Sequence, residues 1–258
     1  MKIITSCVLS AIALSSAAGV GAAEAERANI FRTFTDMVEP AQQQAYEAAV
    51  KTYNKCLGQQ HSKYAWLAWG HETGNTYMYS YAAGPYTWAG FDAMHEIGKT
   101  CDKVWRAEAN AHLKSETSAF LVEIPELSYM PKDRDPKPPL LNVTFFKLKV
   151  THEAEAAFNE GARKIAAAAV KTNWNGYYMF YKIRSGDGEA PDYLVLSPYK
   201  NWAAFGAGHD PALWKMVENA YGKQDGDALH KSVIDSLQES SSHVDSYNEE
   251  LTYMPSGR

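Results

Sequence analysis

The sequence predicts an α+β fold in which one β-α-β-β-α-β unit occurs twice. The segment from Trp88 to His95 reads W-A-G-F-D-A-M-H, and the segment from Trp202 to His209 reads W-A-A-F-G-A-G-H. The shared pattern W-A-x-F-x-A-x-H therefore recurs at an offset of 114 residues, each copy after a Pro-Tyr pair, and Tyr-Met-Pro at 129–131 returns at 253–255. Internal repetition constrains architecture more strongly than composition does.

The first copy is expected to start with a strand over 29–37. A helix over 40–59 follows, with Pro40 in its first turn, where proline is well tolerated. Strands over 64–70 and 76–82 are joined by a turn at Gly74-Asn75. The first W-A-x-F-x-A-x-H helix and a strand over 118–129 complete the unit.

The second copy repeats this order. Apolar and polar residues alternate over 142–150, which is typical of a strand with one wetter face. The helix over 153–172 carries an apolar stripe at helical spacing, formed by Phe158, Ala162, Ile165 and Ala169. Strands over 176–184 and 192–197, the second W-A-x-F-x-A-x-H helix and a strand over 243–253 follow. This element order is that of the split-βαβ, ferredoxin-like unit.

These elements predict two domains and a linker. The first ferredoxin-like repeat covers 26–131 and the second covers 141–258. Proline and charged residues dominate the linker at 132–140, so it is expected to be stiff and solvated.

Residues 1–25 have the features of a secretory signal peptide. Lys2 precedes a stretch over 3–20 that is apolar, small and free of acidic residues, and small residues allow cleavage after Ala22, Ala23 or Ala25. Serine and glycine dilute this stretch too much for a permanent membrane span. We therefore expect a bacterial periplasmic or secreted protein without a membrane anchor.

Two cysteines, Cys56 and Cys101, remain after removal of the signal peptide. Because export leads to an oxidising compartment, we expect a disulfide between them. Two buried free thiols are the alternative.

Composition excludes some partners and favours others. A net charge of −5 argues against nucleic acid, which requires a basic face. The 16 tyrosines and 7 tryptophans suit a cavity for a small apolar or aromatic molecule. The pairs His71-Glu72 and His95-Glu96 lack the i, i+4 spacing of a helical zinc site, so no metal site is predicted.

The repeated motif places Trp88 near His95 and Trp202 near His209 on one face of each predicted helix. One interpretation is an aromatic core between helix and sheet, with a hydrogen-bonded histidine at its edge. The other is a histidine that faces a ligand cavity, where it serves as a base, a donor or a metal ligand.

Aromatic side chains also mark the predicted strands. Trp66 and Tyr178 occupy equivalent places in the second strands of the two copies, and Tyr79 shares one face of its strand with Tyr77 and Tyr81. Because every buried hydroxyl needs a partner, such a face suits either a cavity or a wet sheet surface. The candidate pocket residues are His95, His209, Trp88, Trp202, Trp66, Tyr79 and Tyr178; catalytic residues stay unassigned.

The order and repetition of elements over 29–255 resemble the dimeric α/β-barrel superfamily. This group includes antibiotic-biosynthesis-type monooxygenases, NIPSNAP-like proteins and the chlorite dismutase group. The resemblance implies an intramolecular dimeric α/β barrel made from the two repeats. It also implies that haem could bind through His209 or His230 of the second half, but no catalytic motif of the family is matched.

The sequence therefore predicts an exported small-molecule-binding protein, with an aromatic cavity under its helices and a cofactor-independent oxygenase-like activity. The alternatives are a haem-binding protein of the chlorite dismutase type and a non-catalytic structural or interaction module. A homo-oligomer is compatible with either.

Overall fold

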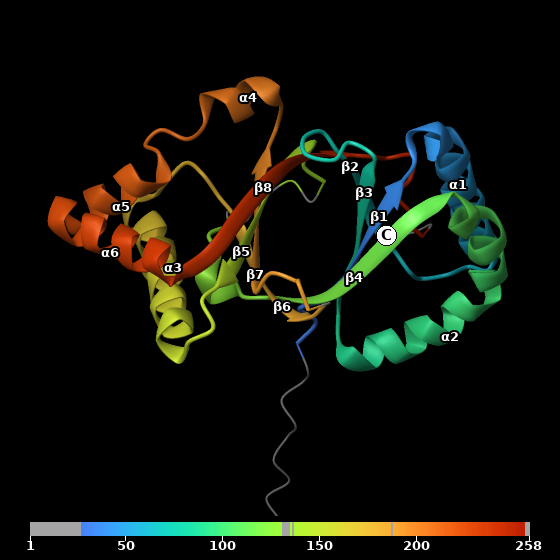
Figure 1. Ribbon diagram of the computed structural model, residues 1–258, viewed down its shortest axis with the longest axis horizontal. Coiled ribbons are helices and arrows are strands. Elements are labelled where there is room, and N and C mark those ends of the chain that lie inside the picture. Colours follow the sequence, from blue (N-terminus) through green and yellow to red (C-terminus); the bar gives the residue numbers. More distant parts are fainter. Residues whose placement is uncertain (1–26, 131–134, 136, 187, 256–258) are drawn as a thin grey trace, which may run out of the picture.

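The computed structural model describes residues 27–130, 135, 137–186 and 188–255. The predicted signal peptide lies outside these residues, as do positions 131–134 and 136 around the predicted linker. The described chain is a mixed α/β fold with an antiparallel sheet, as predicted (Figure 1). Within it, none of the helices combines the length and apolar character needed to cross a membrane.

Each half contributes four strands. The first half contains β1 (Ile30–Val38), β2 (Leu67–His71), β3 (Met78–Tyr86) and β4 (Leu113–Glu123). The second half contains β5 (Leu140–Leu148), β6 (Met179–Ser185), β7 (Tyr193–Tyr199) and β8 (Leu237–Tyr247).

Helices connect the strands. The first half contains η1 (Pro40–Gln42), α1 (Gln43–Gln59), α2 (Trp88–Val104), η2 (Trp105–Ala109) and η3 (Asn110–His112), and η4 (Pro125–Leu127) follows β4. The second half contains α3 (His152–Thr172), α4 (Trp202–Ala207), α5 (Leu213–Tyr221) and α6 (Lys223–Ser236). Figure 1 shows α1 and α2 beside the strands of the first half, and α3, α5 and α6 beside those of the second.

The eight strands close into a barrel in the order β1-β3-β2-β8-β5-β7-β6-β4. Two seams join the halves. In one seam β2 pairs with β8, and in the other β4 pairs with β6; both are antiparallel. Because each strand of the described chain has two neighbours, the sheet that these strands form has no free edge.

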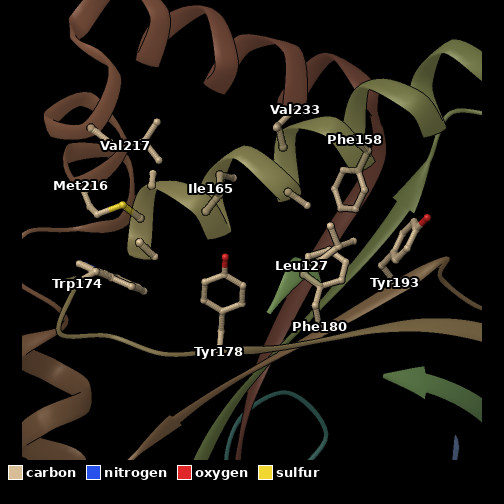
Figure 2. Close-up of a cluster of buried hydrophobic side chains, with 14 of the residues drawn as sticks. Leu127, Phe158, Ile165, Trp174, Tyr178, Phe180, Tyr193, Met216, Val217 and Val233 are labelled. Atoms are coloured by element: carbon tan, nitrogen blue, oxygen red, sulfur yellow. The ribbon is translucent and has the colours of Figure 1, made fainter. Parts of the chain in front are cut away.

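Side chains alternate between the barrel interior and the helices, as the period of a strand requires. Leu141 and Val143 of β5 belong to the interior cluster, together with Leu194 of β7. The opposite face packs against helices. Figure 2 shows Phe158 and Ile165 of α3 above the aromatic side chains of Tyr178, Phe180 and Tyr193, within one buried cluster.

Several boundaries differ from those predicted. The last strand of each half starts earlier than expected, at Leu113 and at Leu237, because polar runs such as Glu239 to Ser242 carry no apolar alternation although they pair in the sheet. The second W-A-x-F-x-A-x-H segment is also not one helix. The helix α4 ends at Ala207, and Gly208 has a φ of 67° that L-residues rarely adopt.

The disulfide between Cys56 and Cys101 is present, with Cα atoms 6.0 Å apart. It ties α1 to α2, and Cys101 is fully buried against Leu57 and Tyr253. The predicted pairing is therefore confirmed in the structure.

Candidate functional site

The barrel encloses a cavity of about 800 Å³. This volume lies within the range of pockets that hold small organic molecules. Inward-facing residues of all eight strands line it, because alternate side chains point into the barrel. The cavity therefore lies inside the barrel and is formed by both halves. The sequence predicts a cavity between the helices and the sheet, but there the helix-facing side chains pack into buried clusters.

Most of the lining is apolar. Its aliphatic and aromatic side chains include Phe31, Trp69, Leu121, Leu141, Phe145 and Ile183. Polar side chains interrupt this lining. Besides hydroxyls such as those of Thr33, Thr117 and Ser241, they include one cluster formed by His71, Ser80, His243 and Asp245. The cavity thus combines a largely apolar surface with this compact cluster, which we call its polar end.

Strand pairing assembles the polar end at the seam between β2 and β8. His71 and Asp245 are direct partners in the register of the two strands, and His243 lies two residues before Asp245 on the same face. The Nε2 atom of His243 lies 3.1 Å from Oδ1 of Asp245, and Nε2 of His71 lies 3.7 Å from the same oxygen. The two imidazole rings stack with centroids 4.2 Å apart.

The polar end has unused hydrogen-bonding capacity. His71 shares a hydrogen bond of 2.9 Å with the Ser80 hydroxyl. Nε2 of His243 and Oδ1 of Asp245 are close but not aligned for a hydrogen bond, and both are buried without a partner in the described part of the chain. Nε1 of Trp69 and the hydroxyl of Tyr247 are buried and unpartnered in the same way. Such groups are rare in folded proteins and need an explanation, such as a bound water, ion or ligand.

Burial sets the charge state of His71. Desolvation lowers the pKa of His71 below its usual value, and the nearby His243 adds to the effect, whereas Asp245 opposes it. His71 is therefore neutral at pH 7, so its imidazole offers a lone pair on one nitrogen and a proton on the other.

Sequence reasoning missed this group. The signal was present as His243-Val244-Asp245, because alternate residues of a strand share one face. The predicted strand over 243–253 included both residues. What the sequence did not show was the pairing of β2 with β8, which brings His71 to them.

The seven predicted pocket residues lie elsewhere. None of them is among the residues that line the barrel cavity. His95 is exposed on α2, whereas the spacing of the motif predicts that it faces inward or lies at the rim of that helix face. Trp88 contacts Phe120 of β4, with ring centroids 5.2 Å apart, as expected of a side chain that faces the sheet, yet it is 43% exposed. Trp202 is 51% exposed, and each tryptophan stands in the first turn of its helix.

The other four predicted residues belong to the packing under the helices. Tyr79 is buried and donates a hydrogen bond of 2.6 Å to Glu47, and Trp66 stacks on Tyr53. Tyr178 lies in the cluster below α3. His209 packs between Trp174 and Tyr199.

Comparison with known proteins identifies the class of fold. No family model matches the chain, and no curated protein matches it in sequence. Among solved structures the chain is similar to an anthrone oxidase-like protein, with a TM-score of 0.54 and 10% identity over 87% of this chain and 93% of that one.

Two further structures are similar to the same degree. A protein assigned as a monooxygenase from Lactobacillus acidophilus matches with a TM-score of 0.52 and 10% identity, over 84% of this chain and 93% of that one. A mutant chlorite dismutase from Candidatus Nitrospira defluvii matches with a TM-score of 0.52 and 9% identity, over 86% and 92%. The predicted resemblance to monooxygenase-like and chlorite dismutase proteins is thus confirmed for the fold alone.

The resemblance to chlorite dismutase raises the question of whether haem fits at the predicted histidines. The ring centroid of His209 lies 4.9 Å from that of Trp174 and 5.3 Å from that of Tyr199. His230 stacks on Trp214 with ring centroids 4.0 Å apart. The space between α3 and the sheet is filled by the cluster shown in Figure 2. As they are packed, these histidines do not fit a haem ligand.

Proposed function

We propose that the barrel cavity binds a small, largely aromatic molecule whose polar group meets the polar end at His71, His243 and Asp245. The cavity itself carries this proposal. It combines a volume of about 800 Å³ with an apolar lining and one cluster of buried polar atoms that lack partners. Ligand sites are typically built in this way, with a few polar groups that fix the orientation of the ligand.

Filling the cavity tests the proposal. Val143 faces the interior and is 5% exposed, so Val143→Phe places a larger side chain in the space that the ligand would occupy. Val150, which follows β5, is 96% exposed, and Val150→Phe is the matched control. Binding of hydroxylated polycyclic aromatics is measured by calorimetry and by quenching of tryptophan fluorescence.

We expect the Val143→Phe variant to bind at least tenfold more weakly than the Val150→Phe variant, with both folded by circular dichroism. Equal affinity of the two variants, or no binding by the unchanged protein across the panel, would contradict the proposal.

A monooxygenase- or oxidase-type reaction on the bound molecule is the second candidate. It is supported by the fold neighbours described as monooxygenase and anthrone oxidase-like. Oxygen uptake in the presence of an anthrone tests it, with the Val143→Phe variant as the control.

We also propose that 26–131 and 141–258 are two copies of one unit, and that the barrel is the single-chain counterpart of one built by two chains. The matching order of elements and the two seams of the barrel support this.

We propose in addition that the protein is exported after cleavage of residues 1–25. The mass of the protein recovered from periplasm or medium tests it.

A further inference from the structure

We propose that His71, His243 and Asp245 bind one divalent transition-metal ion at the polar end of the barrel cavity. This inference deepens the proposed function, because the ion would share the cavity with the small molecule. It does not depend on the ligand, however, and each can be tested without the other.

The donor atoms suit such an ion. Two imidazoles and one carboxylate form a set that holds divalent iron and related metals while leaving coordination positions open. One ligand atom from each residue lies within 4.8 Å of the others. Ligands about 2.0–2.2 Å from a shared ion lie about 3 Å apart, close to the 3.1 Å between Nε2 of His243 and Oδ1 of Asp245.

The buried carboxyl group of Asp245 also requires a partner. Asp245 is 3% exposed, and within the described residues its ion-pair partners are the two histidines, with no lysine or arginine in range. A buried polar atom without a compensating partner is unfavourable, and Oδ1 of Asp245 is such an atom. A divalent cation would serve as its partner and would also use the unpartnered Nε2 of His243.

The second seam of the barrel gives an internal comparison. There Leu121 of β4 pairs with Ile183 of β6, as Asp245 of β8 pairs with His71 of β2. Ala119, two residues before Leu121, takes the place of His243. The barrel therefore closes with apolar residues at one seam and with two histidines and an aspartate at the other. Packing alone does not require these polar residues, because apolar ones close the equivalent seam.

Binding requires a small local change. The two rings are nearly parallel, at 16°, and a nitrogen lone pair lies in the plane of its ring, so at least one ring must turn for both to reach one ion. The adjoining cavity gives it room. If His71 binds through Nε2, its hydrogen bond to Ser80 is exchanged for the metal bond. The remaining coordination positions of the ion would face the cavity.

Metal titration of the untagged mature protein tests the inference. After treatment with a chelator and dialysis, Co²⁺ is added and its visible absorption is followed, and Zn²⁺ is titrated by calorimetry. Bound metal is then quantified by mass spectrometry. We expect one ion per chain, with His243→Ala and Asp245→Asn each weakening binding at least tenfold. The exposed His95→Ala serves as the control and is expected to bind as the unchanged protein does.

A variant that copies the apolar seam guards against loss of folding. It combines His71→Ile, His243→Ala and Asp245→Leu, the residues found at the other seam. We expect it to fold, to be at least as stable as the unchanged protein, and to lose the ion.

Three outcomes would overturn the inference. The first is that the unchanged protein binds no more metal per chain than the triple variant does. The second is an unchanged metal affinity in the Asp245→Asn variant, and the third is bound iron that accompanies a Soret band, which would indicate haem. If the ion fails to bind while aromatic molecules still bind, the proposed function survives without this inference. If the Val143→Phe variant loses aromatic binding but keeps Co²⁺, the two are confirmed as separate properties.

Discussion

The Tyr46 hydroxyl of α1 donates a hydrogen bond to Oδ2 of Asp36 in β1, and Asp36 is only 1% exposed. The other carboxyl oxygen of Asp36 has no partner in the described part of the chain. Glu116 lies directly opposite on β4. A second buried acid, separate from the cavity cluster, thus lies under the helix layer of the first half.

The stability of the protein should depend on pH through Asp36. Desolvation raises the pKa of Asp36 from 3.8 to about 7, with Glu116 adding to the effect and Tyr46 opposing it. The folded state therefore holds a proton between about pH 4 and pH 7 that the unfolded state has lost, so the contribution of Asp36 falls as pH rises through this window. Since one pKa unit corresponds to about 1.4 kcal/mol, the effect is on the order of a few kcal/mol.

Replacing Asp36 by Asn should remove this dependence. Urea unfolding at pH 5 and pH 8 measures the free energy of unfolding of both proteins. Because other groups titrate in the same range, the quantity to compare is the difference between the Asp36→Asn variant and the unchanged protein. We expect the variant to gain stability relative to the unchanged protein as pH rises; an equal difference at both pH values would refute the assignment.

Gly161 allows α3 to approach α6 closely. A Cβ built at Gly161 would lie 2.3 Å from Cγ2 of Val233, a distance that real contacts do not reach. We expect Gly161→Ala to destabilise the protein by about 1–3 kcal/mol, despite the better helix propensity of alanine.

Two further variants check the cause. Val233→Ala should recover part of the loss in the double mutant, since the two sites are coupled by contact. Gly98→Ala in α2, where nothing lies within 4 Å of the added Cβ, should be neutral or stabilising. Additive effects of Gly161→Ala and Val233→Ala would show that the clash is not the cause.

The disulfide should stabilise the first half through its loop. Cys56 and Cys101 are separated by 45 residues. Constraint of a loop of this length in the unfolded chain is worth about 2–4 kcal/mol. We expect the Cys56→Ala and Cys101→Ala double variant to melt at a lower temperature and to be insensitive to dithiothreitol. A melting temperature of the unchanged protein that does not respond to reductant would argue against this contribution.

The histidines of the repeated motif should behave differently from those of the cavity. His209 is partly buried, and desolvation lowers its pKa, whereas His95 is exposed. We expect His209→Ala to reduce stability by about 1 kcal/mol through lost contact with Trp174 and Tyr199. The His95→Ala variant should have nearly unchanged stability. Neither variant should bind aromatic molecules more weakly than the unchanged protein, in the binding assay used for the Val143→Phe variant. A selective loss of binding in either variant would instead support the motif as the ligand site.

Local patterns predicted the fold well where they were strong. Alternation over 142–150 and the stripe of Phe158 and Ile165 gave β5 and α3 within about two residues. The segment over 213–236 forms α5 and α6, which were not predicted as separate helices. Its acidic residues, such as Asp225 and Asp227, are typical of any solvated helix or loop and therefore did not indicate two helices.

The site was harder to predict because it depends on closure of the barrel. His243 and Asp245 share a strand face, and that much is local. His71 is 172 residues away from His243, and only the register between β2 and β8 brings it close. The tyrosine face of β3 is unusual, as predicted, but Tyr79 donates its hydroxyl hydrogen bond to Glu47, and the Tyr81 hydroxyl shares one with Tyr46 of α1.

The two seams also govern how the molecule can be divided. Cutting the chain between β4 and β5 would leave β2 and β4 of one fragment, and β6 and β8 of the other, with open backbone donors and acceptors. Such strands readily pair with foreign chains. An isolated half would thus be prone to self-association. Two complementary fragments produced together can instead pair β2 with β8 and β4 with β6.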